Sequence, residues 1–74
     1  MTHIRYDIFG GDGGWCVRSG DVVGPPYNRK PEALRDVSWT AALLQSTGNE
    51  VEVFLDEGRG PVRYDFNATA SAGG

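Results

Sequence analysis

Apolar and polar residues alternate over residues 3–9, where Ile4, Tyr6 and Ile8 fall on one side of the chain. A period of two residues is typical of a β-strand with one buried face. The same period recurs around residues 15–18, over residues 50–56 and over residues 61–66. The pattern therefore predicts four strands.

Only residues 31–47, PEALRDVSWTAALLQST, carry apolar residues at helical spacing. At about 100° per residue, one stripe is formed by Ala33, Leu34, Val37, Ala41 and Leu44. Pro31 suits the first turn of a helix, and Gly48 suits the position just after its end. We therefore expect one helix whose apolar stripe covers a sheet.

Two turns set the pairing of the strands. Asp12-Gly13 favours a two-residue type I′ turn, because both central residues of that turn need positive φ. Residues 57–60, Glu-Gly-Arg-Gly, join the last two strands. The predicted facing pairs are Ile8 with Val17, Gly10 with Trp15, Asp7 with Arg18, Phe9 with Cys16, Leu55 with Val62, and Val53 with Tyr64. In this register the apolar residues of paired strands share one face.

The expected fold class is α+β, a ββαββ domain over residues 1–66, followed by a flexible tail over residues 67–74. One helix covers one face of a four-stranded antiparallel sheet in the order 2-1-3-4, with the first and third strands central and antiparallel. The alternative is a parallel contact between the second and third strands. The connector over residues 20–28 holds two prolines and forms at most a short edge strand, with Val22, Val23 and Tyr27 on the core.

The core is where the two periodicities meet. Its expected members are Ile4, Tyr6, Ile8, Trp15, Val17, Leu34, Val37, Ala41, Leu44, Val51, Val53, Leu55, Val62, Tyr64 and Phe66.

Composition narrows the function classes. The chain has 74 residues, a formal net charge of −3 and a single lysine, so neutralisation of nucleic-acid phosphates is not expected. Its single cysteine permits neither an internal disulfide nor a cysteine-rich metal site. Without a membrane-length apolar run or a signal-like start, a cytoplasmic protein that does not enter membranes is expected.

The run GGWCVR after a first strand, PEAL at the helix start and the strand EVEVFLDEG together form a recognisable pattern. The chain resembles the small bacterial and phage proteins grouped as domain of unknown function 2188. The matching positions are Gly13, Gly14, Trp15, Val17, Arg18, Glu32 and Ala33. That family has no assigned activity, so the resemblance implies the ββαββ architecture and no chemistry.

Catalytic patterns were sought in the same sequence. The glycine run at residues 10–14 lacks a phosphate-loop motif and leads into a strand, so it offers no helix N-terminus to an anion. Cys16 lies mid-strand without a base nearby in sequence, and His3 is the only histidine. We expect no enzymatic activity, no metal and no cofactor.

Trp39 and Leu43 lie about 40° apart around the helix and roughly 140° or more from its apolar stripe. One interpretation is a rotated or bent helix that brings Trp39 to the margin of the core. The other is an anchor for a protein partner or a second copy, flanked by the polar residues Glu32, Asp36 and Ser46. A non-enzymatic protein-interaction module, self-associating or binding another protein, is therefore the first functional hypothesis.

The alternative hypothesis places the site on the exposed face of the sheet. Its candidate residues are Phe9, Phe54, Arg5, Arg18 and Arg63, which would stack on bases and contact phosphates of a nucleic acid. The predicted register interleaves these arginines with acidic residues. Nucleic acid is for that reason the less expected partner.

Overall fold

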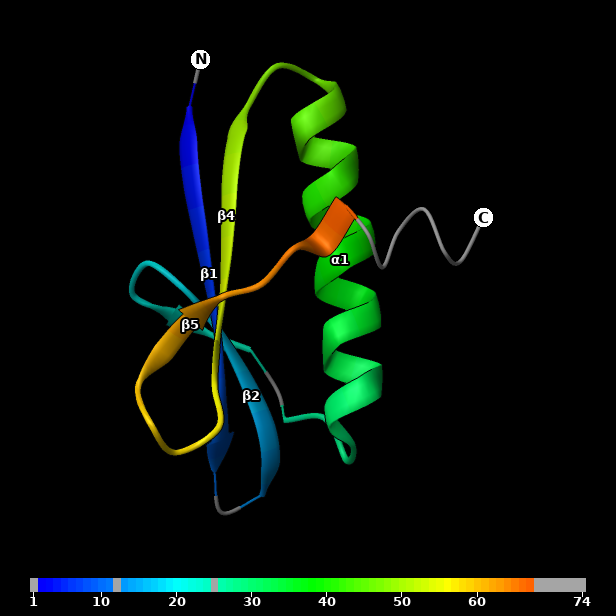
Figure 1. The fold of residues 1–74 in the computed structure, drawn as a ribbon. Helices are drawn as coiled ribbons and strands as arrows, with labels where there is room; N and C mark the ends of the chain where they lie inside the picture. The colour runs from blue at the N-terminus through cyan, green and yellow to red at the C-terminus, as the bar shows by residue number, and fades with distance from the viewer. Residues whose placement is uncertain (1, 12, 25, 68–74) are drawn as a thin grey trace.

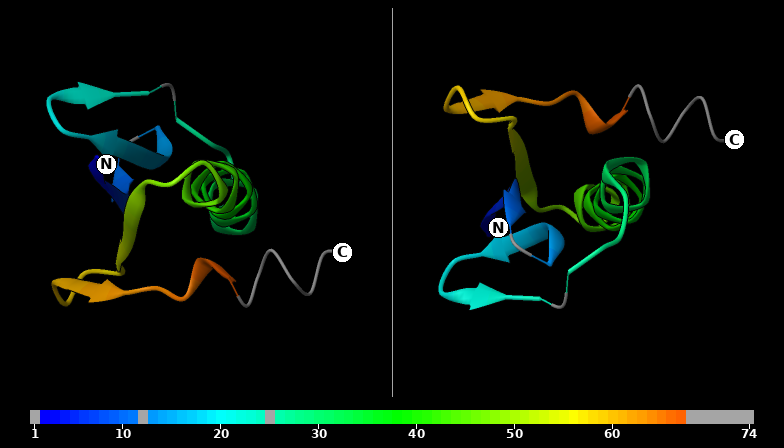
Figure 2. Two further views of the ribbon diagram at one scale, coloured as in Figure 1. Left: turned by 90° about the horizontal axis from the view of Figure 1, so that it is seen from above. Right: turned by 90° about the horizontal axis from the view of Figure 1, so that it is seen from below.

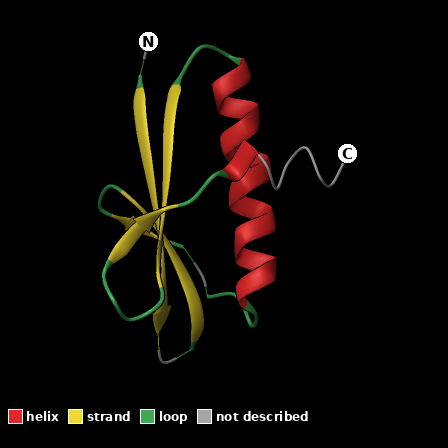
Figure 3. Ribbon diagram, in the orientation of Figure 1, coloured by secondary structure: helices red, strands yellow, loops and turns green. Residues whose placement is uncertain are grey.

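The computed structural model describes residues 2–11, 13–24 and 26–67 (Figure 1). In chain order its elements are β1 (His3–Gly11), β2 (Gly14–Ser19), β3 (Val22–Val23), α1 (Lys30–Ser46), β4 (Glu50–Asp56) and β5 (Pro61–Arg63). The strands form one sheet in the order β3-β2-β1-β4-β5, and α1 lies against one face of it (Figures 1 and 3). The predicted α+β class with one helix is confirmed, with a mixed sheet of five strands in place of four antiparallel ones.

The first hairpin has the predicted register. Ile8 faces Val17, Asp7 faces Arg18, and the last pair is Gly11 with Gly14. The connection between the strands is therefore residues 12–13, although Asp12 itself lies outside the described residues. The expected tail likewise falls outside them from residue 68 onward.

The predicted antiparallel contact between the first and third predicted strands is wrong, because β1 and β4 are parallel. The cause is the connector, which runs back along β2 as β3 and then pairs Tyr27 with Trp15. Two backbone hydrogen bonds join that pair, from Tyr27 N–H to the Trp15 carbonyl at 2.7 Å and from Trp15 N–H to the Tyr27 carbonyl at 2.8 Å. The chain thereby returns to the hairpin end of the sheet before α1 begins, and β4 starts at the same end as β1 (Figure 1).

The same topology separates the second and third predicted strands and requires a glycine at position 14. The alternative contact between the second and third predicted strands is also wrong, because β1 lies between β2 and β4. The return of the connector also requires glycine at position 14, where φ is +125°. A Cβ added at Gly14 would lie 2.2 Å from the carbonyl oxygen of Tyr27.

The second hairpin pairs Leu55 with Val62 as predicted, and the N–H of Tyr64 donates to the carbonyl of Val53 at 2.8 Å. The strand is shorter than predicted, however, and ends at Arg63. The predicted burial of Val62 is wrong, since this side chain is 66% exposed. The reason is that β5 is an edge strand and α1 packs chiefly against β4 and β2.

The helix begins and ends close to the predicted bounds, with Gly48 at φ +96° just beyond it. The carbonyl of Leu44 accepts hydrogen bonds from Thr47 Oγ1 at 2.8 Å and from Asn49 Nδ2 at 2.9 Å. The same carbonyl also accepts from the backbone N–H groups of Thr47 at 3.1 Å and Asn49 at 3.3 Å, so side chains and backbone together satisfy this acceptor in the last turn of the helix.

The buried face of α1 consists of Ala33, Val37, Ser38 and Ala41. The sequence pattern missed Ser38, whose hydroxyl is buried with no hydrogen-bond partner among the described residues. Every residue predicted for the core except Val62 is buried or packs against the buried cluster.

The connector reaches the core through Tyr27 alone of its three predicted contacts. The predicted packing of Val22 and Val23 is wrong, because both are exposed on the short edge strand β3. Figure 2 shows β3 and β5 at opposite edges of the sheet, with α1 between them on one side. Within the described ranges, no helix is long and apolar enough to cross a bilayer.

Candidate functional site

The two sequence hypotheses correspond to two opposite surfaces. The helix outer face comprises Trp39, Leu43, Glu32, Asp36 and Ser46, all of which are exposed. The open sheet face, on the side of the sheet away from α1, comprises Phe9, Phe54, Arg5, Arg18 and Arg63. The structure thus brings each predicted set together on one surface.

Trp39 and Leu43 are 68% and 53% exposed. The buried residues of α1 lie on its opposite side, so the helix is not rotated to bring Trp39 to the core margin. Whether these two side chains bind a partner stays a prediction.

The part of the helix outer face from Trp39 onward is unusual in its lack of charge. From Val37 to Asn49 the sequence contains no aspartate, glutamate, lysine, arginine or histidine, although 23% of the whole chain is charged. Leu43 therefore protrudes among threonine, serine and glutamine side chains, whereas Trp39 has Arg35 and Asp36 one turn before it. Aromatic enrichment and depletion of charge are features of the centre of protein interfaces.

A groove with a volume of about 300 Å³ lies beside Trp39, lined by Tyr27, Arg35, Asp36, Trp39 and Thr40. Burial of the Tyr27 ring raises the pKa of its phenol, and the charge of Asp36 and a hydrogen bond to it raise that pKa further. Tyr27 and Asp36 therefore lie close together on the wall of the groove. Tyr27 was missed as a site residue because the return path of the connector was not apparent from the sequence. Arg35, four residues before Trp39 on the same helix, could have been found from helical spacing.

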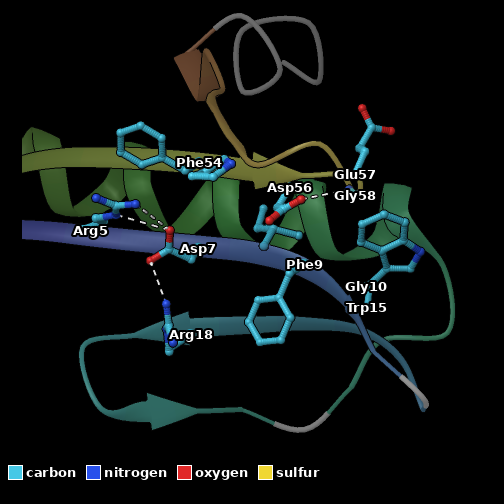
Figure 4. Close-up of a pocket in the computed structure, with 12 residues that line it drawn as sticks. Arg5, Asp7, Phe9, Gly10, Trp15, Arg18, Phe54, Asp56, Glu57 and Gly58 are labelled. Carbon is cyan, nitrogen blue, oxygen red and sulfur yellow. Dashed lines mark hydrogen bonds and ion pairs between the residues drawn. The ribbon is translucent and has the colours of Figure 1, made fainter.

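The open sheet face contains a larger hollow, with a volume of about 690 Å³ (Figure 4). Arg5, Phe9, Arg18 and Phe54 all line it, while Arg63 faces Phe54 across the β4–β5 pair. The size of the hollow is within the roughly 300–1,000 Å³ range of small-molecule sites.

The arginines of this face already have acidic partners. Arg5 Nη2 and Nε donate to Asp7 Oδ1 at 3.0 and 3.2 Å, and Arg18 lies 4.0 Å from the other Asp7 oxygen. Arg63 lies 3.9 Å from Glu52, which also contacts the His3 imidazole. The positive charge that a phosphate would need is largely neutralised by these carboxylates.

The aromatic rings of the hollow are likewise covered by cations of the chain itself. The Arg5 guanidinium lies 4.1 Å from the centre of the Phe54 ring, and that of Arg18 lies 6.0 Å from the Phe9 ring. At the end of the hollow, Lys30 Nζ lies 5.9 Å from the Trp15 ring and 2.5 Å from Glu57 Oε2. These contacts, several with residues that the sequence analysis did not single out, stabilise the sheet and the helix start.

The two side chains considered for catalysis, His3 and Cys16, lie far apart on the sheet. His3 is at the start of β1 beside Glu50, whereas Cys16 faces Phe9. Six residues of strand, about 20 Å at 3.3 Å per residue, separate the two positions along β1. They therefore form no thiol–imidazole pair. Among the described residues, no group of three or more His, Cys, Asp or Glu side chains is placed to hold a metal ion.

The chain matches no family model, no curated protein and no solved structure. The similarity to domain of unknown function 2188 thus stays a prediction. The choice between the two surfaces depends on their own geometry, in which the helix outer face has an exposed tryptophan and the open sheet face has its aromatic and charged groups already paired.

Proposed function

We propose that this chain is a non-enzymatic protein-interaction module that binds a second copy of itself through the helix outer face. The supporting observation is Trp39, which is 68% exposed. Within the described part of the chain, the cation–π contacts involve Phe54, Phe9 and Trp15 and leave the Trp39 ring uncovered.

Burial of the Trp39 side chain would contribute several kcal/mol to the free energy of dimer formation. A tryptophan offers about 150–250 Å² of surface, and burial contributes roughly 25 cal/mol per Å². Burying the exposed two thirds of Trp39 would therefore contribute about 3 kcal/mol per copy. Leu43 adds apolar surface one helical turn away.

The choice of a second copy as the partner follows from charge. Near a two-fold axis each residue faces its own equivalent, so a charged side chain there meets an identical charge. The whole chain carries −3, yet the stretch from Val37 to Asn49 carries none. A two-fold contact whose axis passes through this stretch places no charged residue against its own equivalent.

Nucleic-acid binding by the open sheet face is the second candidate. It is favoured by the gathering of Phe9, Phe54 and two arginines around one hollow. It ranks lower because bases and phosphates would have to displace or share the partners of those side chains. Salt-dependent binding of random oligonucleotides that is lost in Arg5→Ala would place this function first.

Sedimentation equilibrium of the wild type, Trp39→Ala and Leu43→Ala tests the proposal. We expect the wild type to rise with concentration from the 8.0 kDa of one chain towards twice that mass, and both variants to remain near one chain. Val22→Ala is the matched control, because Val22 is an exposed apolar residue outside the helix outer face. A monomeric wild type, or a Trp39→Ala variant that associates as the wild type does, would overturn the proposal.

A further inference from the structure

A two-fold contact places one surface against itself, so any projecting side chain needs a receiving site on that same surface. The helix outer face offers both. Trp39 projects from it, and the groove lined by Tyr27, Arg35, Asp36 and Thr40 lies directly beside that ring. Each copy can therefore give one tryptophan and receive one.

The groove has the size and the polar group that an indole requires. Its volume of about 300 Å³ is at the lower end of ligand pockets, which suits one large side chain better than an extended ligand. The Asp36 carboxylate borders it, with Tyr27 and Arg35 on the same wall. An ionised carboxylate has about four acceptor positions, so further hydrogen bonds can be accepted.

A buried tryptophan side chain needs a hydrogen-bond acceptor such as the Asp36 carboxylate. The indole carries one N–H donor and no acceptor, and a buried indole N–H needs a partner. Asp36 is the only anionic side chain of the groove. A hydrogen bond to a charged acceptor is stronger than one to a neutral group.

We propose that the groove lined by Tyr27, Arg35, Asp36 and Thr40 receives the Trp39 indole of a second copy, with the Asp36 carboxylate accepting the indole N–H. The contact occurs twice about the two-fold axis. This inference rests on the proposed self-association and specifies how the second copy is recognised.

Three variants test this recognition by sedimentation equilibrium. Asp36→Ala removes the acceptor from both contacts of the dimer. Loss of one hydrogen bond to a charged group weakens binding about ten- to a hundredfold, so self-association is expected to weaken about a hundred- to ten-thousandfold. Trp39→Phe keeps an aromatic ring but removes the N–H, and is expected to weaken it to a similar extent. In the Trp39→Phe background, Asp36→Ala is expected to have little additional effect.

Asp21→Ala is the matched control. It removes an exposed acidic residue and changes the net charge by the same amount, but Asp21 lies between β2 and β3, outside the helix outer face and the groove. Weaker self-association in Asp36→Ala but not in the control supports the inference. Equal weakening in both variants would indicate a general effect of charge and would overturn the inference. Circular dichroism of each variant verifies that the fold is kept.

The outcomes separate the two proposals. If Trp39→Ala is monomeric while Asp36→Ala associates like the wild type, the self-association stands and the groove is not the receiving site. Additive effects of Asp36→Ala and Trp39→Phe would also overturn the direct contact, since independent sites add. A wild type that is monomeric throughout would overturn both proposals.

Discussion

The open sheet face and the helix outer face both display aromatic side chains among polar ones, but they differ in what those side chains already contact. On the open sheet face, Phe54 and Phe9 lie beneath Arg5 and Arg18, and the arginines contact Asp7 (Figure 4). On the helix outer face, Trp39 lies in a stretch without charged residues. Exposed aromatic rings alone are therefore a poor guide to a binding surface.

The difference arises from the periods of the two elements. In a strand, residues i and i+2 share a face, so Arg5, Asp7 and Phe9 are neighbours by construction. In a helix, neighbours are three and four residues apart, which places the uncharged Leu43 one turn after Trp39 and the charged pair Arg35 and Asp36 one turn before it. We expect the first surface to contribute to folding stability and the second to association.

Substitution in the core, between the sheet and the helix, is expected to change folding stability most. Val53→Ala removes buried methyl groups from a side chain with 0% exposure, and should lower the free energy of unfolding by about 2–3 kcal/mol. Val62→Ala, in the neighbouring strand, should change it by about 0.5 kcal/mol or less, because Val62 is exposed. Chemical denaturation measures both. Equal losses would show that the helix covers β5 after all.

Phe54→Ala and Leu43→Ala compare the two surfaces directly. Phe54→Ala removes a half-buried ring and its contact with Arg5, and should cost about 1–2 kcal/mol of folding stability without changing sedimentation. Leu43→Ala should leave the stability of the monomer within about 0.5 kcal/mol and weaken association. The comparison fails if Phe54→Ala abolishes association while keeping the fold.

Ser38→Ala should act in the opposite direction. The Ser38 hydroxyl is buried without a partner among the described residues, so its removal should raise the free energy of unfolding by about 1 kcal/mol. Thr40→Ala, at an exposed helix position, gains helix propensity alone and serves as the control. Thermal unfolding at a concentration where the chain is monomeric measures both. A smaller gain at Ser38 than at Thr40 would contradict the expectation.

The smallest effect concerns the groove within one chain. Burial and Asp36 raise the pKa of Tyr27 above its ordinary 10.0. Since folding favours the protonated phenol, this contribution to stability is complete below about pH 10 and is lost as the pH rises through the raised pKa. Tyr27→Phe should remove that part of the pH dependence, measured by denaturant midpoints on either side of pH 10. An unchanged slope would show that folding does not raise the pKa of Tyr27.

Local features were predictable from the sequence because they depend on neighbouring residues. The pairing of Ile8 with Val17 follows from a two-residue connection between alternating strands. The end of the helix at Gly48 follows from the freedom of glycine to adopt positive φ. The exposure of Trp39 and Leu43 follows from helical spacing relative to the apolar stripe.

Tertiary structure decided what depends on the path of the whole chain. The parallel contact of β1 with β4 requires the connector to return to Trp15 through Tyr27, and nothing in the local pattern of residues 20–28 determines that direction. The same return places Tyr27 against Asp36 and so builds the groove beside Trp39. The exposure of Val62 depends on how far the helix extends across the sheet, because period two assigns a side chain to a face and cannot determine whether that face is covered.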